Sequence, residues 1–151
     1  MGVSDRFIDN YLLFQLALAS HTFSEEFYAQ LRTAGVSPSK WRILLNLIDG
    51  PGMYLTSLAK YSLFEQSRVT KLVDQLVGEG LVEKRAGRQD RRRVSIHITN
   101  KGTALIAPLI EEAKVHEDSV LERLTPEDRK NLKSILLKLA HRHSGDVKFV
   151  I

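Results

Sequence analysis

The spacing of apolar residues changes in the middle of the chain, and this change limits the possible folds more than any other feature. Apolar and polar residues alternate in "LVEKR" (Leu81 to Arg85) and again in "VSIHI" (Val94 to Ile98), which is the period of a half-buried β-strand. The segment between them is rich in arginine. Elsewhere the apolar residues recur at helical spacing. The sequence therefore predicts one β-hairpin with a basic tip in an otherwise helical chain.

Four helical segments precede the hairpin. The first is long, with Ser4 as a candidate N-cap and Gly35 as a stop. The second starts with Ser37, a cap, and Pro38, a first-turn proline, and it ends at "DGPG". Two shorter helices follow closely. The expected ranges of the four helices are about 5–33, 38–48, 56–61 and 65–77.

Two further helices follow the hairpin. Thr99 or Asn100 can cap a long helix from about residue 101 to 124, in which Pro108 is a possible kink. Thr125 and Pro126 then repeat the pattern of a cap and a first-turn proline, so a last helix is expected to about His143. The predicted fold is mainly α with a small β-hairpin wing.

Positive charge is concentrated in the middle of the chain. Residues 54–101 hold ten basic and five acidic side chains, a net charge of +5, whereas the whole chain carries +4. The remaining segments are therefore close to neutral. A basic segment of this kind favours an anionic partner such as nucleic acid.

The short paired helices and the basic hairpin together form a winged helix-turn-helix pattern. An α-helix fits the major groove of DNA, where polar side chains on its first turns can read base edges. The candidates for this reading are Gln66, Ser67, Arg68 and Thr70. Phosphate contacts are expected from Lys71 and from Arg88, Arg91 and Arg93 of the hairpin tip. Thr56 and Ser57 either contact phosphates or simply cap their helix.

The segments "SLAKYSLFEQSRVTKLVDQLVGEGLVEKR" and "DRRRVSIHITNKG" resemble the core of the MarR family of bacterial transcription regulators. The wing carries the closest match, because Asp90, Arg92, Thr99 and Gly102 stand at the family's spacing. The resemblance implies that Arg92 reaches the minor groove of DNA. It also implies that Asp90 pairs with an arginine and shapes the hairpin.

One position departs from the family pattern. The turn between the paired helices usually holds glycine near Leu63, whereas this chain reads "SLF" at residues 62–64. Leucine disfavours a left-handed backbone, so we expect a differently built turn and a slightly re-aimed recognition helix.

The terminal helices carry more apolar residues than a winged module can bury, which predicts a helical interface with a second copy of the chain. The resemblance implies the same homodimer. We therefore assign residues 37–100 to the winged helix-turn-helix module, and residues 1–36 and 101–151 to a helical dimerisation region. A twofold dimer predicts an inverted-repeat operator in double-stranded DNA, with half-sites about 34–36 Å apart.

The resemblance further implies a small anionic or phenolic ligand in a cleft between the dimerisation helices and the winged module. The side chains that could reach such a cleft are His21, Tyr28, Trp41 and Arg42. Each of them could instead be an ordinary structural residue, in the core, within its helix or in solvent. The expected function is a dimeric, ligand-responsive DNA-binding regulator that acts as a repressor.

Other classes of function find less support in the sequence. No catalytic motif is present, and we expect neither an enzyme nor a cofactor. The absence of cysteine excludes thiolate chemistry, and His141 and His143 point to different helix faces, so no metal site is expected. The chain has no long apolar run or secretory leader, which points to the cytoplasm. A metal-sensing regulator and a winged-helix protein-interaction module remain as alternatives.

Overall fold

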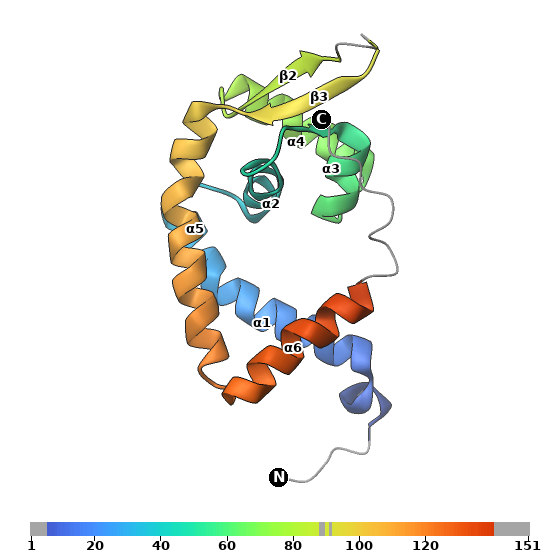
Figure 1. Ribbon diagram of the computed structural model, residues 1–151, viewed down its shortest axis with the longest axis vertical. Helices are drawn as coiled ribbons and strands as arrows, with labels where there is room; N and C mark the ends of the chain where they lie inside the picture. Colours follow the sequence, from blue (N-terminus) through green and yellow to red (C-terminus); the bar gives the residue numbers. More distant parts are fainter. Residues whose placement is uncertain (1–5, 88–89, 91, 141–151) are drawn as a thin grey trace.

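The computed structural model describes residues 6–87, 90 and 92–140, and all structural statements below concern these residues. Six α-helices, one 3-10 helix and three short strands follow one another in this part of the chain (Figure 1). Their order and bounds are η1 (Phe7–Asn10), α1 (Leu12–Thr33), α2 (Pro38–Leu47), β1 (Met53–Tyr54), α3 (Leu55–Ser62), α4 (Gln66–Gly78), β2 (Val82–Ala86), β3 (Val94–Ile98), α5 (Asn100–Leu121) and α6 (Pro126–Ala140).

Three of the predicted helix starts are confirmed by their caps. The hydroxyl of Ser37 accepts a hydrogen bond from the backbone N–H of Lys40 at 3.3 Å, and Pro38 is the first residue of α2. Thr99 caps α5 through the N–H of Gly102 at 3.1 Å. Thr125 accepts from the N–H of Asp128 at 3.2 Å at the start of α6. These local signals satisfy N–H groups that have no partner within the helix.

The first helix was predicted to be one piece, and this prediction is wrong. Tyr11 has an extended backbone (φ −83°, ψ 115°), which separates η1 from α1. The carboxylate of Asp9 accepts hydrogen bonds from the Arg6 guanidinium at 2.8 Å. The backbone carbonyl of Asp9 accepts a hydrogen bond from the side-chain amide of Gln15 at 2.9 Å. These side-chain bonds compete with a continuous helical ladder. Ser4, the proposed cap, lies outside the described residues, as do 141–143 at the end of the last helix.

The predicted hairpin is confirmed, and a third strand joins it. Strands β2 and β3 are antiparallel, with Val82 opposite Ile98 and Ala86 opposite Val94. On the other side of β3, the two residues of β1 pair with Ile96 and Ser95, so the strand order is β1-β3-β2. Strand β1 was not predicted from the sequence, because two residues are too few to show an alternating pattern.

One hydrophobic core joins the winged module to the long helices. Figure 1 shows α2 lying between α5 and α3, with the sheet above it. The most deeply buried side chains come from every one of these elements and from the end of α1, and they include Leu31, Leu44, Leu58, Val73, Ile96 and Ile106. This shared core fixes α3, α4 and the wing relative to α5.

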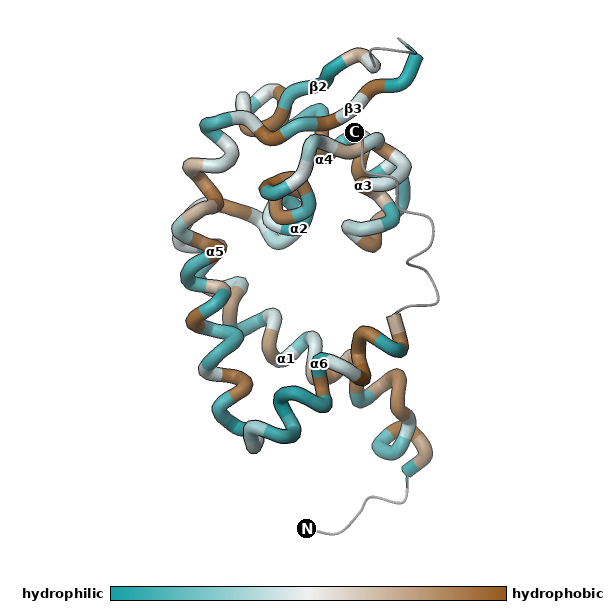
Figure 2. Tube along the Cα trace, viewed as in Figure 1, coloured by the Kyte–Doolittle hydropathy of each residue, from teal (hydrophilic) through white to brown (hydrophobic). Residues whose placement is uncertain are grey.

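The other end of the molecule leaves apolar side chains uncovered. No residue of η1 or α6 is buried, and Phe7, Leu13 and Leu137 are 79%, 60% and 61% exposed. Figure 2 shows hydrophobic stretches along the first half of α1 and toward the C-terminal end of α6. Among the described residues, no helix combines the length and the apolar character needed to cross a membrane.

Candidate nucleic-acid interface

The turn between α3 and α4 adopts the left-handed conformation that leucine was expected to prevent. Leu63 has φ 57° and ψ 40°, and it is the only residue other than glycine with positive φ in the described chain. Its N–H donates to the carbonyl of Lys60 at 3.3 Å, and the N–H of Phe64 donates to that of Ala59 at 3.2 Å. These two bonds form a Schellman motif, which ends a helix in a left-handed residue. The expectation of a differently built turn is therefore wrong.

Two features make leucine acceptable at this position. Its side chain is 80% exposed, so it displaces no neighbouring group. The next residue, Phe64, packs against the core and anchors the turn. The two hydrogen bonds and this packing offset a backbone strain of about 1–2 kcal/mol.

The helix that follows the turn has one buried and one free face. Val69, Val73 and Leu76 of α4 are buried in the core. On the opposite face Ser67 and Lys71 are exposed. Gln66 is also exposed, at the first position of the helix, and its carbonyl accepts a hydrogen bond from the hydroxyl of Thr70 at 2.9 Å. Of the side chains that were predicted to contact DNA, Ser67 and Lys71 therefore lie on this free face, and Thr70 is half-buried.

Arg68 lies on the flank of α4 rather than on its free face. Its Nη2 donates to Oγ of Ser39 in the first turn of α2 at 2.8 Å. Its Cζ lies 4.2 Å from the centre of the Phe64 ring. The sequence predicted an exposed arginine here, which is confirmed, but it gave no sign of these two contacts.

The C-terminal end of α4 is tied to two other helices. Oε1 of Glu79 lies 2.5 Å from Nζ of Lys40 in α2, and the same carboxylate accepts from Gln75 at 3.3 Å. The backbone carbonyl of Glu79 accepts from Nζ of Lys101 in α5 at 2.7 Å. Together with the buried face, these contacts fix the direction in which α4 presents its free face.

The tip of the wing is closed by Asp90. Its carboxylate accepts from the backbone N–H of Arg92 at 3.0 Å, and its carbonyl accepts from the N–H of Arg93 at 3.0 Å. Gly87 closes the tip by donating to the carbonyl of Arg93 at 2.7 Å. Asp90 thus shapes the tip through backbone bonds, and its pairing with an arginine stays a prediction. Arg88 and Arg91 lie outside the described residues.

The other two arginines of the wing tip, Arg92 and Arg93, differ in their surroundings. Arg92 is exposed at the tip. Arg93 lies with its Cζ 5.4 Å from the centre of the Tyr54 ring. Since Tyr54 belongs to β1 and is also the N-cap residue of α3, this contact links the wing to the helix pair.

Thr56 and Ser57 do not cap α3. The N-cap residue is Tyr54, and no side chain makes a capping hydrogen bond there. Thr56 is exposed and Ser57 is half-buried in the first turn. The capping alternative is therefore wrong, and a phosphate contact by either hydroxyl stays a prediction.

His97 has a packing role beneath the wing. A Cβ on Gly52 would lie 2.3 Å from the imidazole ring, so the ring rests directly on the glycine backbone. Its Nε2 lies 2.8 Å from Oγ of Ser95. Burial, and then the positive charge of Arg85, lower the pKa of His97 below its ordinary value.

The four predicted ligand-cleft residues have different environments. Trp41 belongs to the core, with its ring centre 5.3 Å from that of Phe27. Tyr28 packs against the core from α1, and His21 is exposed on the same helix. Arg42 is half-buried, and its Nη1 donates to the carbonyl of Ser62 at 3.3 Å.

A shallow depression of about 370 Å³ lies between the end of α1 and the middle of α5. Its lining residues are Gln30, Thr33, Ala34, Leu109 and Glu112. None of the four predicted cleft residues lines it. In the described part of the chain, no group of three or more His, Cys, Asp and Glu side chains is placed to hold a metal ion.

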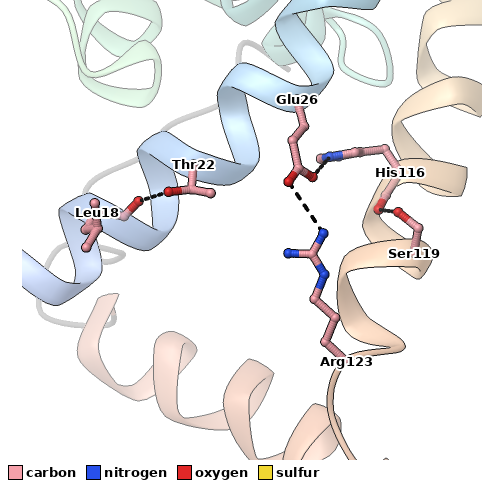
Figure 3. A network of polar contacts seen from close by, with 6 residues as sticks. All are labelled: Leu18, Thr22, Glu26, His116, Ser119 and Arg123. Atoms are coloured by element: carbon pink, nitrogen blue, oxygen red, sulfur yellow. Dashed lines mark hydrogen bonds and ion pairs between the residues drawn. The ribbon is translucent and has the colours of Figure 1, made fainter. Parts of the chain in front are cut away.

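A polar network joins α1 to α5 below the winged module (Figure 3). Figure 3 shows Glu26 of α1 pointing toward His116 of α5 and toward Arg123, which follows α5. Nε2 of His116 lies 3.2 Å from Oε2 of Glu26, and Nη2 of Arg123 lies 3.4 Å from Oε1. Arg123 also lies over the ring of Phe23, with its Cζ 5.8 Å from the ring centre. This network was not foreseen from the sequence, because its partners are 90 and 97 residues apart.

Comparison with known proteins agrees with this architecture. The model of the MarR family matches residues 34–93. Among curated relatives, the chain is similar to the HTH-type transcriptional repressor YetL of Bacillus subtilis (strain 168). The two are 28% identical over 134 residues, which span 87% of this chain and 78% of that protein.

Solved structures are similar over nearly the whole chain. A MarR family transcriptional regulator from Silicibacter pomeroyi DSS-3 superposes with a TM-score of 0.82 at 38% identity, covering 91% of this chain and 98% of that one. The transcriptional repressor CouR, bound to a 23-mer DNA duplex, gives 0.78 at 26% identity, covering 93% and 99%. NadR in complex with 4-hydroxyphenylacetate gives 0.78 at 25% identity, covering 93% and 97%.

Proposed function

The chain belongs to the MarR family of winged helix-turn-helix transcription regulators, and on that premise we propose that it is a homodimeric repressor that binds an inverted-repeat DNA operator under the control of a small ligand. The observation that carries the proposal is the pairing of a free face of α4 with a basic wing. Ser67 and Lys71 occupy that face, and Arg92 is exposed at the wing tip. A helix and an arginine-bearing hairpin on one module suit a major groove and the neighbouring minor groove.

Within this proposal the predicted residues divide by role. Gln66, Ser67, Arg68 and Thr70 meet base edges in the major groove, and Arg92 enters the minor groove. Phosphates are contacted by Lys71, by the remaining wing arginines and by the first turn of α3, and these contacts position the protein without reading sequence. The remaining wing arginines are Arg88, Arg91 and Arg93, and the first-turn residues of α3 are Thr56 and Ser57. Two related proteins support the function as a DNA-binding repressor, since YetL is named a transcriptional repressor and the repressor CouR was solved on DNA.

The uncovered apolar side chains support the homodimer. Ile135 and Leu139 of α6 are 51% and 58% exposed, and apolar side chains of η1 and α1 are also uncovered. Large apolar side chains left exposed in such number commonly mark a protein interface. The second copy covers residues 1–36 and 101–151 in this proposal, and its twofold axis relates the two α4 helices.

The ligand is proposed to be a small anionic or phenolic molecule. NadR, a similar structure, holds 4-hydroxyphenylacetate. His21, Tyr28 and Arg42 remain candidates for contacts with such a molecule. Trp41 is buried in the core, so it would support the cleft from there. A ligand changes DNA binding only if its affinity differs between the DNA-competent and the incompetent arrangement of the dimer. A regulator of this kind acts on the chromosome, so the proposal includes a cytoplasmic location.

The deciding experiment is a selection of binding sites from a randomised duplex library. The salt concentration is set at about 150 mM, so that attraction to phosphates alone does not dominate. We expect enrichment of an inverted repeat whose half-sites lie one helical turn apart. If the folded dimer enriches no sequence, with or without phenolic acids such as 4-hydroxyphenylacetate, the proposal fails and the basic wing serves another anionic partner.

The homodimer is tested separately by sedimentation. Replacement of Ile135 by glutamate places a charge on the uncovered face of α6, so we expect a shift from dimer to monomer. Lys130→Glu changes an exposed polar position of the same helix and is the matched control. A wild-type protein that sediments as a monomer at all concentrations contradicts the dimer.

A further inference from the structure

The guanidinium of Arg68 is held in place although it is exposed to solvent. It donates to Ser39 of α2 and lies over the ring of Phe64 in the turn before α4. An exposed arginine at the surface of a helix ordinarily samples many rotamers. Two contacts from different elements favour one orientation of this side chain.

The ring of Phe64 is itself well fixed. It packs against the core and follows the left-handed residue that ends α3. A second guanidinium, that of Arg42, lies with its Cζ 5.0 Å from the ring centre and donates to the carbonyl of Ser62. The aromatic ring therefore provides a rigid support for two cations, through the attraction between a cation and the π-face of the ring.

Holding a side chain in its bound orientation reduces the entropy lost on binding. Arginine reads DNA through a planar fork of donors, and its contacts depend on the angle at which the fork meets a base or a phosphate. Recognition by Arg68 therefore depends on the orientation of its guanidinium. That orientation is set by Ser39 and Phe64, which both lie outside α4.

We propose that Phe64 and Ser39 are positioning residues for DNA recognition, which hold the guanidinium of Arg68 in the orientation that meets the operator. This inference rests on the proposed function. It adds two specificity-determining residues, one in the helix-turn-helix turn and one in α2, and neither needs to touch DNA. It also explains why the turn carries an aromatic residue directly after its left-handed position.

The test uses the full-length protein and the operator sequence enriched in the selection. Arg68→Ala is expected to lower operator affinity about tenfold or more, because it removes a good base contact. Phe64→Leu keeps an apolar side chain in the core but removes the ring, and Ser39→Ala removes the hydroxyl. Each is expected to lower affinity several-fold. Phe64→Tyr keeps the ring and is expected to bind like the wild type.

Two readouts separate positioning from a merely structural role. The first is a double-mutant cycle: in the Arg68→Ala background, Phe64→Leu should cause no further loss. The second is the set of affinities for operators with single base-pair changes. Phe64→Leu should weaken discrimination at the same base pair as Arg68→Ala and leave the other positions unchanged.

A third readout needs no DNA. The ring current of Phe64 should shift the side-chain NMR signals of Arg68 upfield, and Phe64→Leu should abolish this shift while Phe64→Tyr keeps it. The inference is overturned if Phe64→Leu lowers operator affinity by the same factor in the wild type and in the Arg68→Ala background. It is also overturned if Arg68→Ala leaves the affinity unchanged, or if Phe64→Leu raises it. If the wild-type protein enriches no operator, the proposed function itself fails, and the inference falls with it even where the NMR shift is present.

Discussion

Nε2 of His116 lies 3.2 Å from Oε2 of Glu26, and this contact joins α5 to α1 across 90 residues of sequence. The hydrogen bond from His116 is the main cause that lowers the pKa of the Glu26 carboxyl below its ordinary value, and the charge of Arg123 acts in the same direction. The ionised carboxylate is thus favoured in the folded chain. A long-range link between the two helices therefore depends on pH.

We expect this link to stabilise the protein above the ordinary pKa of a glutamate and to be lost in acid. A carboxyl whose pKa is lowered on folding contributes stability above its unfolded value, and this contribution disappears as the pH falls through the folded value. Glu26→Gln should lower the melting temperature near neutral pH, and its difference from the wild type should shrink as the pH falls through the lowered pKa of the folded carboxyl. Glu25→Gln, at an exposed neighbouring position, is the control. A difference that persists unchanged in acid contradicts the prediction.

Leu63→Gly should stabilise the protein, although it removes an apolar side chain. Glycine adopts the left-handed conformation without the steric cost that leucine carries. Glycine also loses more backbone entropy on folding than leucine does, but we expect the relief of strain to be larger, so the free energy of unfolding should rise by up to about 1 kcal/mol. Urea unfolding at a fixed protein concentration measures the change. Leu63→Ala keeps the Cβ and should change little. Equal shifts in both variants would show that backbone strain is not the cause.

Gly102→Ala should severely destabilise the junction between the wing and α5. A Cβ at this position would lie 2.2 Å from the carbonyl oxygen of Leu81 and 2.8 Å from Cγ1 of Ile98. Because the first of these is backbone, the chain itself must move, and we expect a loss of about 2–4 kcal/mol or a failure to fold. Gly78→Ala is the matched control, since nothing lies within 4 Å of its Cβ. Thermal unfolding of both variants tests the prediction.

Arg92→Ala should weaken binding to the selected operator at near-physiological salt. The lost contact is an arginine in a narrow minor groove, so the loss should be largest for operators with A·T base pairs beneath the wing. Arg32→Ala removes the same side chain from the exposed end of α1 and is the control. Equal affinities for wild type and Arg92→Ala in a fluorescence anisotropy titration would refute the assigned role.

Lys71→Ala should weaken binding to all duplexes by about the same factor. A phosphate contact carries no sequence information, and its removal should reduce the slope of log affinity against log salt by about one unit. Titrations at several salt concentrations, with the selected operator and with a scrambled duplex, measure both quantities. A loss confined to the selected operator would assign Lys71 to base reading instead.

The sequence was sufficient for features that depend on neighbouring residues. The caps at Ser37, Thr99 and Thr125 and the alternation on both sides of the basic tip located three helix starts and the hairpin, because hydrogen bonds and side-chain spacing within a few residues decide them. The wing spacing that ends at Gly102 likewise pointed to the MarR family. Helical spacing likewise placed Ser67 and Lys71 on the free face of α4.

Local patterns failed where distant groups decide the outcome. Leu63 adopts a left-handed backbone that its own preference disfavours, because two hydrogen bonds and the packing of Phe64 offset the strain. Strand β1 exists only through its pairing with β3, which lies more than 40 residues later. The first helix breaks at Tyr11 although its apolar spacing continues.

The sequence by itself thus determined where five of the six described α-helices begin and end to within a few residues, where the basic hairpin stands and which face of α4 is free. The tertiary structure alone decided how Arg68 is held by Ser39 and Phe64, and how Glu26 joins α1 to α5. The reason is physical. Periodicity and capping depend on interactions within one or two turns, whereas these contacts form only after the core has brought distant helices together.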